Sequence, residues 1–261
     1  MEVIVRNTRE EAVALTADIL ARALRTKPSL TLGLATGRTM EAVYDRLVAM
    51  HEEDGLDFSL ARTFNLDEYV GIPPEDPRSY RFYMAKHLLS RVNIDPRNAH
   101  LPDGMTADLD AECRRYEEEI QAVNGIDVQL LGVGKTGHIG FNEPLSAMRS
   151  RTRVKALTPE TLKQNAAPFG GEDKVPRWAI TMGVGTILEC KQCVLLATGG
   201  DKADIVAKAV EGPITSMISA TALQLHPACT VIVDEQTASK LEHIEYYRWI
   251  FQNEPHWQTY Q

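Results

Sequence analysis

The chain has 261 residues, of which 44% are hydrophobic and 25% are charged, as in globular proteins that bury a sizeable core. Its 28 lysines and arginines against 36 aspartates and glutamates give a net charge of −8. Proteins that bind nucleic acids usually carry a net positive charge, so this acidic chain is not expected to be one of them. The first residues show no secretory signal, and no apolar run is long enough for a membrane helix. We therefore expect a cytoplasmic protein with no nucleic-acid or membrane partner.

Short apolar strands alternate with helices along the chain. Helices are predicted at residues 9–24, 40–50, 80–90, 108–123 and 202–210, with a polar-aromatic helix closing the chain. Strands are predicted at residues 30–35, 62–66, 128–132, 178–182, 194–198 and 229–233. Nearly continuous apolar strands between helices indicate a parallel sheet that is covered on both faces. We expect an α/β fold: a single doubly wound, Rossmann-like domain over residues 1–261, with a mainly parallel sheet flanked by helices.

Two of the four cysteines, Cys190 and Cys193, have the spacing of a zinc or redox motif. A structural zinc site needs a second pair of ligands at suitable spacing, and none accompanies Cys113 or Cys229. Cys193 also leads directly into a predicted apolar strand. We interpret the cysteines as packing residues and expect no metal.

Polar residues follow several predicted strands, at residues 36–39, 67–68, 132–144 and 198–202. In doubly wound sheets, ligands bind beyond the carboxyl ends of the strands, where the strand order switches direction. Residues 132–137 also fit the dinucleotide-binding pattern G-x-G-x-x-G, but the following residues cannot begin a regular helix. A nucleotide-binding P-loop is excluded because a required glycine is Gln129.

Three side chains at these strand ends could transfer protons. His138 and Glu143 lie on one glycine-rich loop, where a carboxylate can orient an imidazole; alternatively, both bind loop backbone. Asp67 could be a general base, or it could cap a turn. Its neighbour Glu68 is expected to face solvent.

The residues Thr36, Gly37, Arg38 and Thr39 join a strand to a helix. Free amides at a helix N-terminus suit an anion such as phosphate, and Arg38 could add contacts of its own. Lys202, at the start of another helix, could supply a second positive charge. The alternative is that both segments are simple tight turns.

Residues 64–71 (Phe-Asn-Leu-Asp-Glu-Tyr-Val-Gly) and 137–144 (Gly-His-Ile-Gly-Phe-Asn-Glu-Pro) resemble the two signature segments of the glucosamine-6-phosphate deaminase family. Further matching stretches follow in the same order, at residues 32–37, 110–117, 150–153, 181–186 and 223–227. Because the matches span the chain from about residue 30 to 235, the chain is identified as a member of this family.

The resemblance implies conversion of glucosamine 6-phosphate to fructose 6-phosphate and ammonia, with no metal or organic cofactor. It implies that His138 opens the sugar ring, that Glu143 assists, and that Asp67 moves a proton between C2 and C1. Residues 36–39 and Lys202 match the phosphate cradle of the family. The expected partner is a small amino-sugar phosphate, bound by a monomer or a homo-oligomer.

Three positions depart from the family pattern. Thr136 stands where many members carry an aspartate that pairs with the signature histidine; a hydroxyl can bind an imidazole but cannot stabilise its cation by charge. Arg38 replaces a glycine of the phosphate loop. Ala167 replaces an arginine that grips the phosphate, and Arg38 could substitute for its charge. These changes bear on the exact substrate more than on the reaction class.

Ser146, Arg153 and Lys155 match positions that bind an allosteric activator in hexameric members of the family. The alternative is a solvated basic loop and strand. Two other functions remain open: a sugar-phosphate lactonase of the same superfamily, and a sugar-phosphate sensor without turnover. Retention of Asp67 and Glu143 favours the deaminase.

Overall fold

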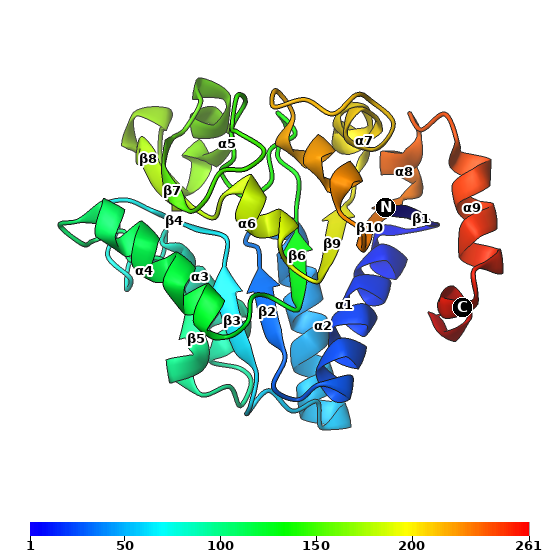
Figure 1. The fold of residues 1–261 in the computed structure, drawn as a ribbon, viewed down its shortest axis with the longest axis horizontal. Coiled ribbons are helices and arrows are strands. Elements are labelled where there is room, and N and C mark those ends of the chain that lie inside the picture. The colour runs from blue at the N-terminus through cyan, green and yellow to red at the C-terminus, as the bar shows by residue number, and fades with distance from the viewer. Residues whose placement is uncertain (261) are drawn as a thin grey trace.

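The structure is a computed structural model that describes residues 1–260, and its main feature is a sheet of seven parallel strands (Figure 1). The strand order is β1-β10-β9-β6-β2-β3-β5. These strands are β1 (Glu2–Arg6), β2 (Thr31–Leu34), β3 (Arg62–Asn65), β5 (Ala99–His100), β6 (Val128–Leu131), β9 (Gln192–Ala197) and β10 (Cys229–Asp234). Helices flank this sheet, so the expected doubly wound α/β fold is confirmed.

A second, smaller sheet contains three antiparallel strands: β4 (Asp67–Tyr69), β8 (Trp178–Thr181) and β7 (Arg153–Ala156), in the order β4-β8-β7. The predicted strand at residues 178–182 therefore forms, but outside the main sheet. In Figure 1 this small sheet lies above the upward-pointing arrowheads of β2 and β3, beside α5. It thus covers part of the edge where the carboxyl ends of the main strands meet.

The helices follow the predicted pattern, with additional short ones. They are α1 (Arg9–Thr26), α2 (Arg38–Asp54), α3 (Tyr80–Met84), α4 (Leu109–Ala122), α5 (Pro159–Phe169), α6 (Val184–Leu188), α7 (Ala203–Val210), α8 (Glu235–Ala238) and α9 (Ile244–Asn253). A π-helical turn, Ala85–Leu89, extends α3. At the start of α1, the Thr8 hydroxyl accepts a hydrogen bond from the Glu11 amide at 3.1 Å, as a capping residue does.

The order of the strands creates a switch point between β2 and β6. From β2 the chain moves outward to β3 and β5, and then returns to the other side of β2 to form β6, β9 and β10. The loops after β2 and β6 therefore leave the same edge of the sheet in neighbouring positions. A crevice is expected at such a point.

A small hydrophobic cluster joins the second sheet to α5. Its buried members are Tyr69, Phe141, Leu157, Phe169, Val175 and Ala179. The ring of Phe169, near the end of α5, lies 5.4 Å from the ring of Tyr69, measured between centroids. This packing fixes α5 above the carboxyl edge of the main sheet. Among residues 1–260, no helix is both long and apolar enough to span a membrane.

Candidate active site

A cavity of about 1280 Å³ opens at the switch point. It brings together most of the residues that the sequence singled out: Thr36, Gly37, Arg38, Thr39, Asp67, His138 and Lys202. Thr136 and Glu143 are not part of its lining, because they lie behind His138. Proton-transfer groups and cations thus share one cavity, although they come from loops far apart in the chain.

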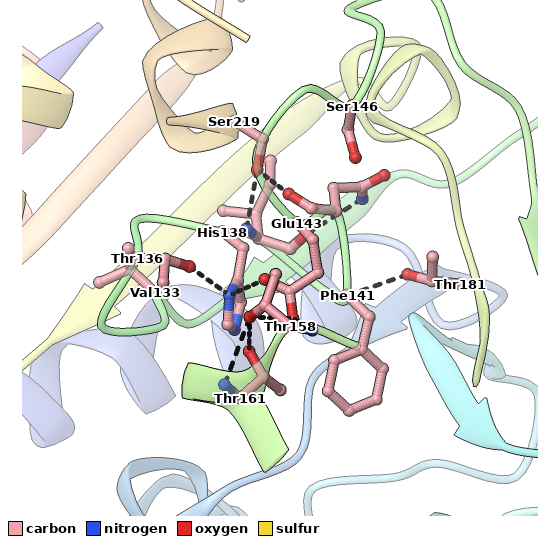
Figure 2. A network of polar contacts seen from close by, with 12 residues as sticks. Val133, Thr136, His138, Phe141, Glu143, Ser146, Thr158, Thr161, Thr181 and Ser219 are labelled. Carbon is pink, nitrogen blue, oxygen red and sulfur yellow. Dashed lines mark hydrogen bonds and ion pairs between the residues drawn. The ribbon is translucent and has the colours of Figure 1, made fainter. Parts of the chain in front are cut away.

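His138 is held by two partners on the same ring nitrogen. The Thr136 hydroxyl lies 2.8 Å from its Nδ1, and the Glu143 Oε2 atom lies 3.2 Å from the same Nδ1. Figure 2 shows these two side chains on either side of the imidazole. Neither partner occupies Nε2, the nitrogen left for a ligand. The ring fits because position 134 is glycine: a Cβ there would lie 2.0 Å from His138 Nε2.

Glu143 also connects the loop to helix α5. Its Oε1 accepts hydrogen bonds from the Thr158 amide at 3.1 Å and from the Thr158 hydroxyl at 3.2 Å, and Thr158 is the N-cap of α5. Burial raises the pKa of Glu143, but the hydrogen bond and charge of His138, with the hydroxyl of Thr161, outweigh burial and lower the pKa below its usual value. Glu143 is therefore an ionised partner for the imidazole.

Asp67 is the first residue of β4, and its side chain is 6% exposed. Burial, reinforced by the neighbouring charge of Glu68, raises the pKa of Asp67 to about 8; the amide of Phe141 opposes this only in part. Gly140, next to Asp67 Oδ2, has a φ of +56°, in the left-handed region that favours glycine. A carboxyl group with such a pKa can exchange protons near neutral pH.

Glu68 does not face solvent, contrary to expectation. It is buried, and its two oxygens accept hydrogen bonds from the amides of Tyr69, Tyr80 and Arg81, each at 2.9 Å. Two of these amides open α3, so Glu68 satisfies donors that a helix start leaves free. Its role is to fix α3, which places the Tyr80 ring in the cavity wall.

The other end of the cavity is cationic. Gly37, the N-cap of α2, has a φ of +114° and no side-chain cap, so the first amides of this 17-residue helix are free for an anion. Lys202 donates a hydrogen bond to the Val133 carbonyl at 3.0 Å. Burial lowers the pKa of Lys202; the charge of Asp201 opposes this shift, and the charges of Lys135 and Arg38 add to it. Three cations thus gather around one helix N-terminus.

Several residues of the cavity wall escaped the sequence reasoning, among them Tyr80, Lys135 and Lys163. Lys163 lies on α5, four residues before Ala167, and residues at this spacing share a helix face. It therefore brings a cation from the same helix that lacks the expected arginine. The only available signal was its helical spacing from Ala167, and helix α5 was not predicted.

Ser146, Arg153 and Lys155 do not line the cavity. Arg153 donates hydrogen bonds to Asn142 Oδ1 at 2.9 Å and to Ser146 Oγ at 3.0 Å. Asn142 precedes Glu143 in the loop, so Arg153 is connected to the site through one side chain. A regulatory role for these residues stays a prediction.

Comparisons with known proteins identify the family of the chain. The family model described as glucosamine-6-phosphate isomerases/6-phosphogluconolactonase matches residues 6–238. Glucosamine-6-phosphate deaminase of Hahella chejuensis is 49% identical over 250 residues, which cover 96% of this chain and 95% of the relative. The corresponding protein of Streptomyces coelicolor is 46% identical and covers 99% of both chains.

Solved structures also match members of this family. A monomeric glucosamine-6-phosphate deaminase superposes with a TM-score of 0.90 at 43% identity, covering 92% of this chain and all of the other. The 6-phosphogluconolactonase of Trypanosoma cruzi has a TM-score of 0.74 at 21% identity, with 92% and 97% covered, which shows a shared fold. The chain belongs to the glucosamine-6-phosphate isomerase/6-phosphogluconolactonase family.

Proposed function

We propose that the protein converts glucosamine 6-phosphate and water to fructose 6-phosphate and ammonia. The observation that carries the proposal is the cavity itself, because it pairs Asp67 and His138 with a cationic helix N-terminus. The relatives that are 46–49% identical are named as deaminases of this substrate. Metal or organic cofactors are not required, because each step is a proton transfer or a hydrolysis.

The phosphate occupies the cationic end of the cavity in this proposal. The free amides of α2 donate hydrogen bonds to its oxygens, while Lys202 and Arg38 supply charge. Lys135 and Lys163, which also line the cavity, add further positive charge. Holding the remote phosphate places the sugar carbons against the proton-transfer groups, which is how binding energy assists a reaction elsewhere on the substrate.

His138 opens the sugar ring. Its free Nε2 moves a proton between the C1 hydroxyl and the ring oxygen, which breaks the bond from C1 to that oxygen and gives the open-chain aldehyde. Glu143 stabilises the imidazolium that forms transiently, and the Thr136 hydroxyl helps to orient the ring.

Asp67 then carries out the isomerisation. Its carboxylate removes the proton from C2, giving an enolamine, and returns this proton to C1, giving an imine at C2. Water adds to the imine, and the bond from C2 to nitrogen breaks with release of ammonia. Because Asp67 is buried, the proton that it holds exchanges slowly with solvent, so the same proton can reach C1.

An assay of purified protein with glucosamine 6-phosphate tests this function by following ammonia and fructose 6-phosphate together. We expect both products in equal amounts, and an Asp67→Asn variant should be slower by roughly 100-fold or more, the usual contribution of a positioned base. Hydrolysis of 6-phosphogluconolactone without ammonia release would favour the lactonase. Binding without turnover of any amino-sugar phosphate would favour a sensor.

We also propose that the enzyme works in the cytoplasm, as a monomer or a homo-oligomer, and that residues 1–261 form a single domain. The net charge of −8 is compatible with this setting. Size-exclusion chromatography with light scattering would distinguish a monomer from an oligomer.

A further inference from the structure

Cys190 and Cys193 meet at the amino end of β9, on the opposite edge of the main sheet from the cavity. Cys190 lies in the turn after α6, and Cys193 is the second residue of β9. Their sulfur atoms are 3.2 Å apart, although the two side chains are only 5% and 0% exposed. A disulfide requires a separation of about 2.0 Å, so a shift of little more than an ångström would join them.

We propose that Cys190 and Cys193 are a modification site, a dithiol that small hydroperoxides convert reversibly to a disulfide. The inference is independent of the deaminase function, because neither cysteine lines the cavity. It also departs from the expectation that these residues serve only to pack the core.

The surroundings make Cys190 the attacking thiol. The sulfur atoms of Cys190 and Cys193 share a hydrogen bond, and the His226 Nε2 atom lies 3.6 Å from the Cys190 sulfur, which also lies 3.2 Å from the Gln192 carbonyl oxygen. The contacts with Cys193 and with His226, in this order of strength, lower the pKa of Cys190 to about 6 although burial opposes them, whereas the pKa of Cys193 is raised. Cys190 is thus the thiolate, and Cys193 is placed to resolve the oxidised form.

The same three residues could be mistaken for a metal site, since their ligand atoms lie within 4.8 Å of one another. The histidine argues against a metal. The Ala228 amide donates to His226 Nδ1 at 3.0 Å, so Nε2 carries the proton, which it donates to the Cys190 carbonyl at 2.8 Å. Both ring nitrogens are therefore used by the backbone, and neither is free to bind a metal ion.

The reaction balances with a hydroperoxide as oxidant. The Cys190 thiolate attacks one peroxide oxygen, the O–O bond breaks, and a sulfenic acid forms with release of hydroxide or alkoxide. The Cys193 sulfur then attacks the Cys190 sulfur, the S–O bond breaks, and water leaves as the disulfide forms. The two thiols lose two electrons, which the peroxide gains, and a dithiol reductant reverses the change.

Peptide mapping tests the proposal directly because Lys191 lies between the two cysteines. Protein treated with hydrogen peroxide is unfolded, its remaining thiols are alkylated, and it is cut with trypsin. A disulfide holds residues 178–191 and 192–202 together as one linked species, which a reductant separates. We expect this species in high yield from the native protein, and much less from protein unfolded before the peroxide is added.

Two variants sharpen the result. Cys193→Ser should abolish the linked species and leave Cys190 oxidised to sulfinic acid. Cys229→Ser is the matched control, because Cys229 pairs with Cys193 on the adjacent strand, and it should keep the linked species. A linkage from residues 192–202 to the peptide that contains Cys229, or no linked species from native protein, would overturn the proposal. Purified protein that contains one zinc ion per chain, with unreactive thiols, would also overturn it.

Discussion

At the scale of one residue, the fold gives Asp67 the burial and the charged neighbour that raise the pKa of its carboxyl group. Its position after a buried strand suggested a role, and the structure adds what the pattern could not: nearly complete burial beside a second carboxylate, Glu68. The sequence also identified His138 and Glu143 from their spacing on a glycine-rich loop. It misjudged Glu68 because the helix that this side chain caps begins twelve residues later.

The pH dependence of kcat/KM follows from the pKa of about 8 for Asp67. The base must be ionised to accept a proton, so kcat/KM should rise with pH and level off above about 8, gaining roughly tenfold from pH 7 to the plateau. Initial rates at low substrate concentration, measured from pH 5 to pH 10, would check this. A profile that is already flat at pH 6 would contradict the assignment.

The cations at the phosphate end give a second prediction. Arg38→Gly and Lys163→Ala should each raise KM by roughly tenfold, the effect of losing one charged contact, with little change in kcat. Lys208→Ala is the control, because Lys208 is an exposed lysine of α7 outside the cavity. An unchanged KM in Arg38→Gly would show that this residue does not compensate for Ala167.

Helix α5 is the missed element that matters most for the site. Its residues form a helix because Thr158 caps it, Pro159 fits the first turn and Gly170 ends it in the left-handed region; Pro168, near its end, obscured the pattern. In the main sheet, β1 and β5 were missed, whereas β2, β3, β6, β9 and β10 were predicted from their apolar runs. The short strands β4 and β7 were not, because they are defined by pairing with β8 rather than by their own composition.

The link from Thr158 to Glu143 makes α5 part of the site. Thr158→Val removes the hydroxyl that contacts Glu143 and also the N-cap, so kcat should fall by roughly tenfold and the protein should lose about 1 kcal/mol of stability. Thr158→Ser keeps the hydroxyl and should restore both. A Thr158→Val variant with lowered stability but unchanged kcat would reduce Thr158 to a capping residue.

At the scale of the molecule, the net charge of −8 and the cationic end of the cavity are compatible because charge is distributed unevenly. The composition excluded a polyanionic partner but did not bear on a small phosphate. The switch point between β2 and β6 gathers segments that are separated by about a hundred residues. Only the topology shows that these segments meet, whereas the motifs show which of them carry polar groups.

The buried acid also affects the stability of the whole chain. Asp67 keeps its proton in the folded state up to about pH 8, whereas the unfolded chain releases it near its ordinary pKa of about 4. Stability is therefore lost as pH rises between these values, and Asp67→Asn avoids this loss. We expect its melting temperature at pH 8 to exceed that of the original protein by about 5 °C, with a smaller difference at pH 5. An equal or lower melting temperature at pH 8 would contradict the assignment.

The transfer of a proton from C2 to C1 by Asp67 is the central claim. Glucosamine 6-phosphate deuterated at C2 tests it most directly, with the fructose 6-phosphate analysed by mass spectrometry and NMR. We predict ammonia release, deuterium at C1 of part of the product, and loss of both in Asp67→Asn. Turnover that persists unchanged in Asp67→Asn, or product formed without any deuterium at C1, would contradict the account.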